Sequence, residues 1–180
     1  AFWITWVGFI ATISTEFATA FWAAALVRDR TDATAAISTI AIMALGIGMA
    51  IGRFFGGRVM HKLSLDHQLT AVLLLQLFSF FGIWLSHNLA ISLVALLLNG
   101  LGISMQFALT SLRLISHSQG RPELAIGKSS LAAGIAIGGA PFLLGVLGDS
   151  FGISRAYMMV PVLILIAIAI VRIIPAKAEH

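Results

Sequence analysis

The sequence predicts an all-α membrane protein in which six transmembrane helices form two inverted three-helix repeats. Of its 180 residues, 59% are hydrophobic and only 10% are charged, and the mean hydropathy is +1.02. Such values are typical of a chain that lies in a lipid bilayer. The chain also divides into six apolar runs, each near the roughly 20 residues that a helix needs to cross the hydrocarbon core.

The six spans form a single bundle over residues 1–180, and each ends where charged residues, Gly, Pro or Ser interrupt the apolar run. The breaks read, in order, "RDRTD", "RVMHKLSLDH", "SHN", "RLISHSQGRPE" and "GDSFGISR". We place the spans at 2–27, 35–57, 69–86, 89–112, 124–147 and 156–174.

The distribution of basic residues predicts the orientation of the bundle. With six spans, both termini share one side of the membrane with the second and fourth loops. Of the eleven Lys and Arg residues, eight fall on that side: Arg53, Arg58, Lys62, Arg113, Arg121, Lys128, Arg172 and Lys177. Because basic residues accumulate on the cytoplasmic side, we expect both ends of the chain to be cytoplasmic. Arg53 and Lys128 are expected to reach toward the cytoplasmic headgroups.

The character of the spans repeats with a period of three, which predicts the inverted repeats. Spans one and four carry polar side chains, spans two and five hold ten of the seventeen glycines, and spans three and six are almost purely apolar. Two stripes of glycines follow helical spacing and allow close helix packing. They are Gly48, Gly52 and Gly56 in span two and Gly134 with Gly138 in span five. A unit of three spans inverts the topology of the next unit.

Three short motifs resemble the C-terminal six helices of the major facilitator superfamily of secondary transporters. "GVLGDSFG" fits the G-x-L-x-D-x-x-G spine of that family's loop signature, and "GRFFGGRVMHKL" resembles a degraded copy in which His61 replaces the Asp. "GIAIGGAPFLLG" is similar to the glycine-proline motif of the family's antiporters. The resemblance implies that spans one and four line a central cavity, that spans two and five contact the other half of the transporter, and that spans three and six face lipid.

Glu16 is the candidate coupling residue, because a carboxyl group in the middle of a span is costly unless it has a function. Thr12 and Thr19 share its helix face at i−4 and i+3, so we expect a polar stripe that lines the cavity. In the functional interpretation Glu16 gains and loses the coupling proton. In the structural interpretation it is a protonated side chain that hydrogen-bonds to a neighbouring helix.

Span four carries a second polar stripe. Asn99 and Gln106 are seven residues apart with Thr110 on the same face, so they are candidates to line the cavity and hydrogen-bond a solute. Alternatively, the two amides hold helices together. Pro141 is expected to loosen span five for gating, and Asp149 to cap or clamp helix ends at the outer surface.

Other classes of protein lack support in the sequence. The basic residues are scattered, which argues against nucleic-acid binding. There is no cysteine, the histidines lack metal-ligand spacing, and "GKSS" lacks the first glycine of a P-loop, so we expect no metal and no cofactor. The sequence has neither the nucleophile motif of an intramembrane serine protease nor the Asn-Pro-Ala boxes of a water channel, and we expect no enzymatic activity.

The sequence therefore predicts half of a secondary active transporter that moves a small solute by alternating access and is coupled to protons. Its partners are membrane lipid, the solute, the proton and an N-terminal six-helix half, which we expect to precede residue 1. We expect the chain in the plasma membrane, the inner membrane of a bacterium. The substrate and the direction of coupling stay open, and a structural or assembly subunit is the alternative function.

Overall fold

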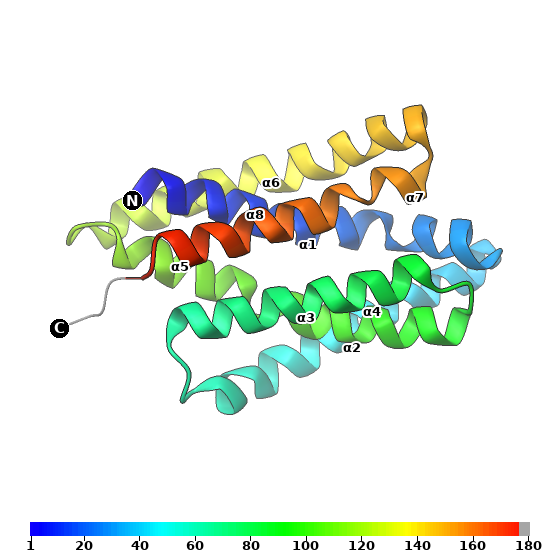
Figure 1. Cartoon of the computed structure of the whole chain (residues 1–180), viewed down its shortest axis with the longest axis horizontal. Helices are drawn as coiled ribbons and strands as arrows, with labels where there is room; N and C mark the ends of the chain where they lie inside the picture. Colours follow the sequence, from blue (N-terminus) through cyan, green and yellow to red (C-terminus); the bar gives the residue numbers. More distant parts are fainter. Residues whose placement is uncertain (177–180) are drawn as a thin grey trace.

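The computed structural model describes residues 1–176, which form eight α-helices and no strand (Figure 1). Lys177, which entered the charge comparison, and His180 lie outside the described residues. The helices are α1 (Phe2–Thr31), α2 (Ala35–Met60), α3 (Leu65–Leu85), α4 (Leu89–Ile103), α5 (Gln106–Ser116), α6 (Pro122–Phe151), α7 (Ile153–Ala156) and α8 (Met159–Ile173).

In the described part of the chain, six helical segments are long and apolar enough to cross a membrane. Four are single helices, whereas the fourth is built by α4 and α5 and the sixth by α7 and α8. The fourth segment is interrupted by a turn at Ser104 and Met105, in the middle of its length. Polar side chains begin α2 and α4: Thr34 accepts from the Ile37 amide, and Asn88 accepts from the amides of Ala90 and Ile91.

The packing of the helices confirms two inverted three-helix repeats. The first repeat is α1, α2 and α3, and the second is α4 with α5, then α6, then α7 with α8. In each repeat the second helix packs mainly on the first helix of the other repeat, as α2 does on α4 and α6 on α1. The third helix of each repeat also packs on the first helix of the other repeat, as α3 does on α4 and α8 does on α1. Figure 1 shows α1 running through the centre, with α6 and α2 at opposite edges.

Glycines let α4 lie in direct backbone contact with two neighbours. A Cβ atom at Gly48 would overlap the carbonyl oxygen of Leu97, and one at Gly100 would overlap the carbonyl oxygen of Leu45, so α2 and α4 touch backbone to backbone. On the other side of α4, a Cβ at Gly102 would lie 2.9 Å from the Val72 carbonyl oxygen of α3. The predicted glycine stripe of α2 thus packs inside the bundle, where dispersion and close approach hold helices together in lipid.

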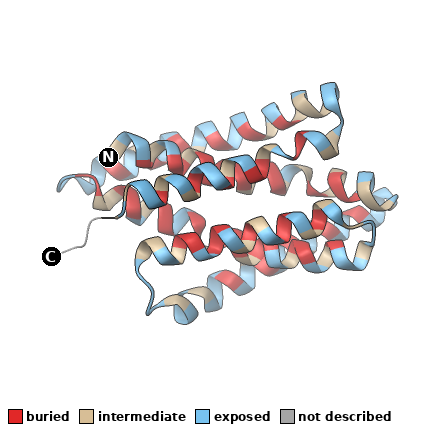
Figure 2. Cartoon of the chain, in the orientation of Figure 1, coloured by how far each residue is buried: buried red, intermediate tan, exposed pale blue. Residues whose placement is uncertain are grey.

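The two edge helices bury the least surface (Figure 2). Within an apolar stretch of 18 residues in each helix, the buried share is 56% in α1, 28% in α2 and 22% in α6. The exposed surface of α6 carries large apolar side chains such as Leu131, Ile135 and Phe142. In a bilayer such side chains meet lipid or another membrane-embedded surface.

We predict that Gly48→Ala destabilises the bundle, whereas Gly46→Ala on the same helix does not. The added methyl group at residue 48 has to push α2 away from the α4 backbone, and overpacking of this kind costs about 1–3 kcal/mol. A Cβ at Gly46 meets no atom within 4 Å. Thermal unfolding of the purified protein in detergent, followed by tryptophan fluorescence, measures both effects. Equal melting temperatures for the two variants would contradict the backbone contact.

Candidate functional site

Glu16 lies in the middle of α1 and is half-buried. Its carboxyl group makes no hydrogen bond or ion pair with another described residue. Thr12 and Thr19, predicted to share its face, are both buried. The Thr12 hydroxyl donates to the Gly8 carbonyl of its own helix over 2.8 Å, whereas the Thr19 hydroxyl has no hydrogen-bond partner among residues 1–176.

A buried network of amides lies beside Glu16 and is centred on Gln76 of α3. The Gln76 Nε2 donates to the Thr15 hydroxyl over 3.0 Å, and the Gln106 Nε2 donates to the Gln76 Oε1 over 2.8 Å. The Asn99 Nδ2 donates to the Gln76 carbonyl over 3.2 Å. The network therefore ties α1, α3, α4 and α5 together next to the coupling candidate.

Sequence reasoning missed Gln76, because span three was treated as uniformly apolar. The signal was available: a single amide among leucines and phenylalanines is costly in hydrocarbon and needs a partner, as Glu16 does.

The predicted cavity residues of span four point into the bundle in this structure. Asn99, Gln106 and Thr110 are all buried, and the Thr110 hydroxyl donates to the Gln106 carbonyl over 2.6 Å. These hydrogen bonds agree with the structural interpretation of the two amides. The Asn99 Oδ1 and the Gln106 Oε1 keep no partner among the described residues, and the cavity-lining role of the stripe stays a prediction.

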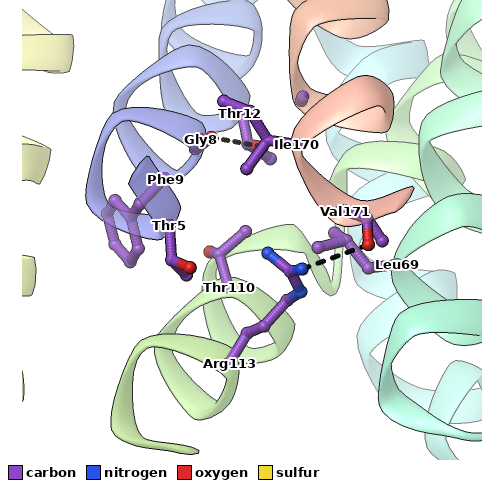
Figure 3. Close-up of a pocket in the computed structure, with 10 residues that line it drawn as sticks. Thr5, Gly8, Phe9, Thr12, Leu69, Thr110, Arg113, Ile170 and Val171 are labelled. Carbon is purple, nitrogen blue, oxygen red and sulfur yellow. Dashed lines mark hydrogen bonds between the residues drawn. The ribbon is translucent and has the colours of Figure 1, made fainter. Parts of the chain in front are cut away.

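The cavity beside the polar stripes is small. A volume of about 10 Å³ lies where α1, α5 and α8 meet, beside Thr5, Thr12, Thr110 and Arg113 (Figure 3). It holds about one water molecule, whereas small-molecule sites span roughly 300–1,000 Å³. A larger pocket of about 350 Å³ lies at the start of α1, beside Trp3, and Glu16 lines neither space.

Arg113 and Asp66 form an ion pair at the end of the bundle where α8 ends. The Arg113 Nε lies 2.7 Å from the Asp66 Oδ1, and the Arg113 Nη2 donates to the carbonyls of Val171 and Ile174 at the end of α8. The Asp66 Oδ2 also accepts from the Ala176 amide over 2.8 Å. One buried ion pair thus fastens α3, α5 and the chain after α8 to one another.

The two predicted glycine stripes face different surroundings. A Cβ at Gly52 would overlap the Ser104 side chain, and one at Gly56 would overlap Met105, so the α2 stripe packs on the turn between α4 and α5. A Cβ at Gly134 or Gly138 of α6 meets no atom within 4 Å. The α6 stripe is therefore open, and no described element covers it.

Pro141 takes part in a contact between α6 and α1. The Trp22 Nε1 donates to the Pro141 carbonyl over 3.0 Å, and Gly145 makes room for the same indole, because a Cβ there would lie 3.1 Å from the ring. Asp149 is exposed near the C-terminal end of α6 and makes no hydrogen bond or ion pair with the rest of the described chain. The gating role of Pro141 and the capping role of Asp149 stay predictions.

Arg53 is the second charged residue that lies well inside a span. It is exposed on α2, and its positive charge acts on the Glu16 carboxyl. From the sequence, we expected the side chains of both Arg53 and Lys128 to reach the cytoplasmic headgroups. Lys128 lies in the first two turns of α6, with its Nζ 5.5 Å from the centre of the Trp3 ring, and the placement of both residues at the headgroups stays a prediction. Residues 1–176 contain no group of three or more His, Asp or Glu side chains placed to hold a metal ion.

Comparison with solved structures identifies the fold. The POT family transporter PepTSo matches this chain with a TM-score of 0.82, and the match covers 99% of this chain and 39% of that transporter at 12% sequence identity. No protein-family model and no curated protein matches the sequence. The chain is therefore an integral membrane protein with the six-helix half-fold of a transporter, and it spans about two-fifths of the transporter it matches.

We predict that Asp66→Asn destabilises the protein by about 3 kcal/mol, because it leaves the buried Arg113 cation without its counter-ion. The double variant Asp66→Leu with Arg113→Met removes both charges and should recover most of that loss. Unfolding curves of the single and double variants form a double-mutant cycle that measures the coupling. Additive effects of the two changes would show that the pair contributes no coupling energy.

Proposed function

We propose that the chain is the C-terminal half of a proton-coupled secondary transporter of the major facilitator superfamily, which moves a small solute across the plasma membrane by alternating access. Both ends of the chain lie in the cytoplasm in this proposal. The observation that carries it is the placement of Glu16: a half-buried, unpaired carboxyl at mid-span, within a half-fold shared with a known transporter. Intramembrane carboxyl groups of this kind characterise proton and ion pathways.

The N-terminal half is proposed to cover the open faces of α6 and α2. Gly134, Gly138 and Gly139 of α6 and Gly46 of α2 all face open space, so the backbones of partner helices can approach closely. The solute then binds between the halves, because Glu16 lines neither the 10 Å³ cavity nor the 350 Å³ pocket of this chain. Half-buried Glu16, on the helix between these two edge helices, is proposed to reach that shared space.

The first test of this function is Glu16→Gln in the complete protein. Gln keeps the shape and hydrogen-bonding capacity of a protonated Glu but cannot release a proton. We expect accumulation driven by a pH gradient to be lost while exchange between equal pools persists, and Glu16→Asp to retain partial coupling. Proteoliposomes containing an internal pH-sensitive dye, challenged with a panel of amino acids, sugars and carboxylates, report solute-driven proton flux.

The outcome separates the two interpretations of Glu16. If the residue is only a buried hydrogen-bonding group, Gln replaces it well and gradient-driven transport continues at the wild-type rate. That result, at matched protein levels, would remove the support for proton coupling.

A second prediction concerns the open glycine face. Gly138→Leu should leave the six-helix bundle intact, because no described atom lies near a Cβ there, but should reduce transport about tenfold or more, since a loss of 1.4 kcal/mol at the interface already gives a factor of ten. Ile166→Phe, an enlargement on the exposed surface of α8, is the matched control. Normal uptake by a correctly inserted Gly138→Leu protein would show that this face meets lipid or open space.

A further inference from the structure

Two charged residues away from the helix ends make no hydrogen bond or ion pair with the rest of the described chain, and they are half-buried Glu16 and exposed Arg53. Among the described residues, the other charged side chains on helices packed against α1 lie near helix ends, and they are Arg58, Asp66, Arg113, Glu123, Lys128, Asp149, Arg155 and Arg172. Glu16 lies in the middle of α1 and Arg53 lies about two turns before the end of α2, and neither makes a hydrogen bond or ion pair within residues 1–176. Lys128 lies at a similar distance from the start of α6, but its Nζ lies over the Trp3 ring. Arg113, by contrast, is buried and fully engaged.

Helix contacts place Arg53 at the depth of the turn between α4 and α5. Gly52, the residue before Arg53, packs directly on Ser104 in that turn. Arg53 is the next residue along α2, and its side chain is exposed. It therefore stands at the level of the break in the fourth span and points to a surface that no described element covers.

The amide network places Glu16 at the same depth. Gln106, just after the turn, donates to Gln76, and Gln76 donates to Thr15, the residue before Glu16. These contacts connect the neighbour of Arg53 with the neighbour of Glu16 through one layer of the bundle. Glu16 and Arg53 thus lie at the same depth, on adjacent helices that pack on each other.

We infer that Arg53 is an anion-binding residue and that the transported solute carries a carboxylate group, which binds Arg53 in place of Glu16; this inference rests on the proposed transporter function. An exposed guanidinium at bilayer depth requires a counter-ion. Its planar fork of donors matches a carboxylate with two hydrogen bonds. A single arginine balances one carboxylate better than it balances a phosphate group, which is close to doubly charged at neutral pH.

Charge balance explains how such a site couples the solute to the proton. With the site empty, ionised Glu16 neutralises Arg53. With a proton on Glu16 and a carboxylate on Arg53, the site is again neutral. Binding of only the proton leaves it positive, and binding of only the carboxylate leaves it negative. Because a net charge is costly in a closed, low-dielectric site, only the empty and the fully loaded forms change conformation readily. The result is electroneutral movement of one proton with one carboxylate.

The test uses three probes of similar size in the complete protein: propionate, propionamide and propylammonium, compared at constant ionic strength. We expect propionate to raise the thermal midpoint, and the neutral and cationic probes to leave it unchanged. Inorganic phosphate, as the fourth probe, should stabilise the protein less than propionate. Absence of propionate-specific stabilisation up to about 100 mM, well above the range of millimolar affinity, would overturn the inference.

Substitutions on α2 test whether Arg53 is the residue that binds propionate. Arg53→Gln should weaken propionate binding about tenfold or more, and Arg58→Gln, an exposed arginine further along α2, should not weaken it. Arg53→Lys keeps the charge but loses the fork, so its affinity should fall several-fold, and this variant decides the question if Arg53→Gln does not fold. Unchanged propionate affinity in the folded Arg53 variants would overturn the inference.

Glu16→Gln separates this inference from the proposed function. Without a competing carboxylate, the variant should bind propionate more tightly than wild type and with less dependence on pH. If propionate binding requires Arg53 but the Glu16→Gln variant still accumulates solute when driven by a pH gradient, the anion site is supported and proton coupling through Glu16 is wrong. If gradient-driven transport requires Glu16 but the Arg53 variants bind propionate with wild-type affinity, the transporter function is supported and the anion site at Arg53 is wrong.

Discussion

The structure depends on one constraint: a polar group at bilayer depth has to find its partner within protein, because hydrocarbon offers none. Gln76 satisfies this constraint through Thr15, Gln106 and Asn99, and in doing so it connects four helices across the centre of the bundle. Arg113 satisfies it through Asp66 and the carbonyls at the end of α8. These pairings hold the interior of the half as one rigid unit.

Glycine serves two purposes on the two edge helices. Gly48 and Gly52 of α2 are covered by the backbone of α4 and by Ser104, so they fix the packing between the two repeats. Gly134 and Gly138 of α6 have the same spacing but no neighbour. Spacing along a helix is therefore insufficient to say which surface a glycine stripe meets, since it defines a face of one helix and says nothing about the helix opposite.

The sequence predicted the number of spans and their inverted pairing, because bilayer thickness determines the length of each apolar run and an odd repeat reverses topology. It missed Gln76, whose hydrogen-bond partners lie on helices distant in sequence. Arg53 resembles a snorkelling residue when only its distance from the helix end is considered. Its relation to Glu16 follows from the layer of contacts through Ser104, Gln106 and Gln76.

Rigid and exchangeable interactions occupy different parts of this half. The ion pair of Asp66 and Arg113 is largely buried, so separating it would leave an uncompensated charge, and in the proposed transport cycle it stays closed. Half-buried Glu16 and exposed Arg53 make no hydrogen bond or ion pair with the rest of the described chain, so in the proposed function a proton, a solute or a second bundle pairs with them. The alternating access that we propose needs both kinds of interaction: a bundle that moves as one body, and a surface whose charges change partners as it moves.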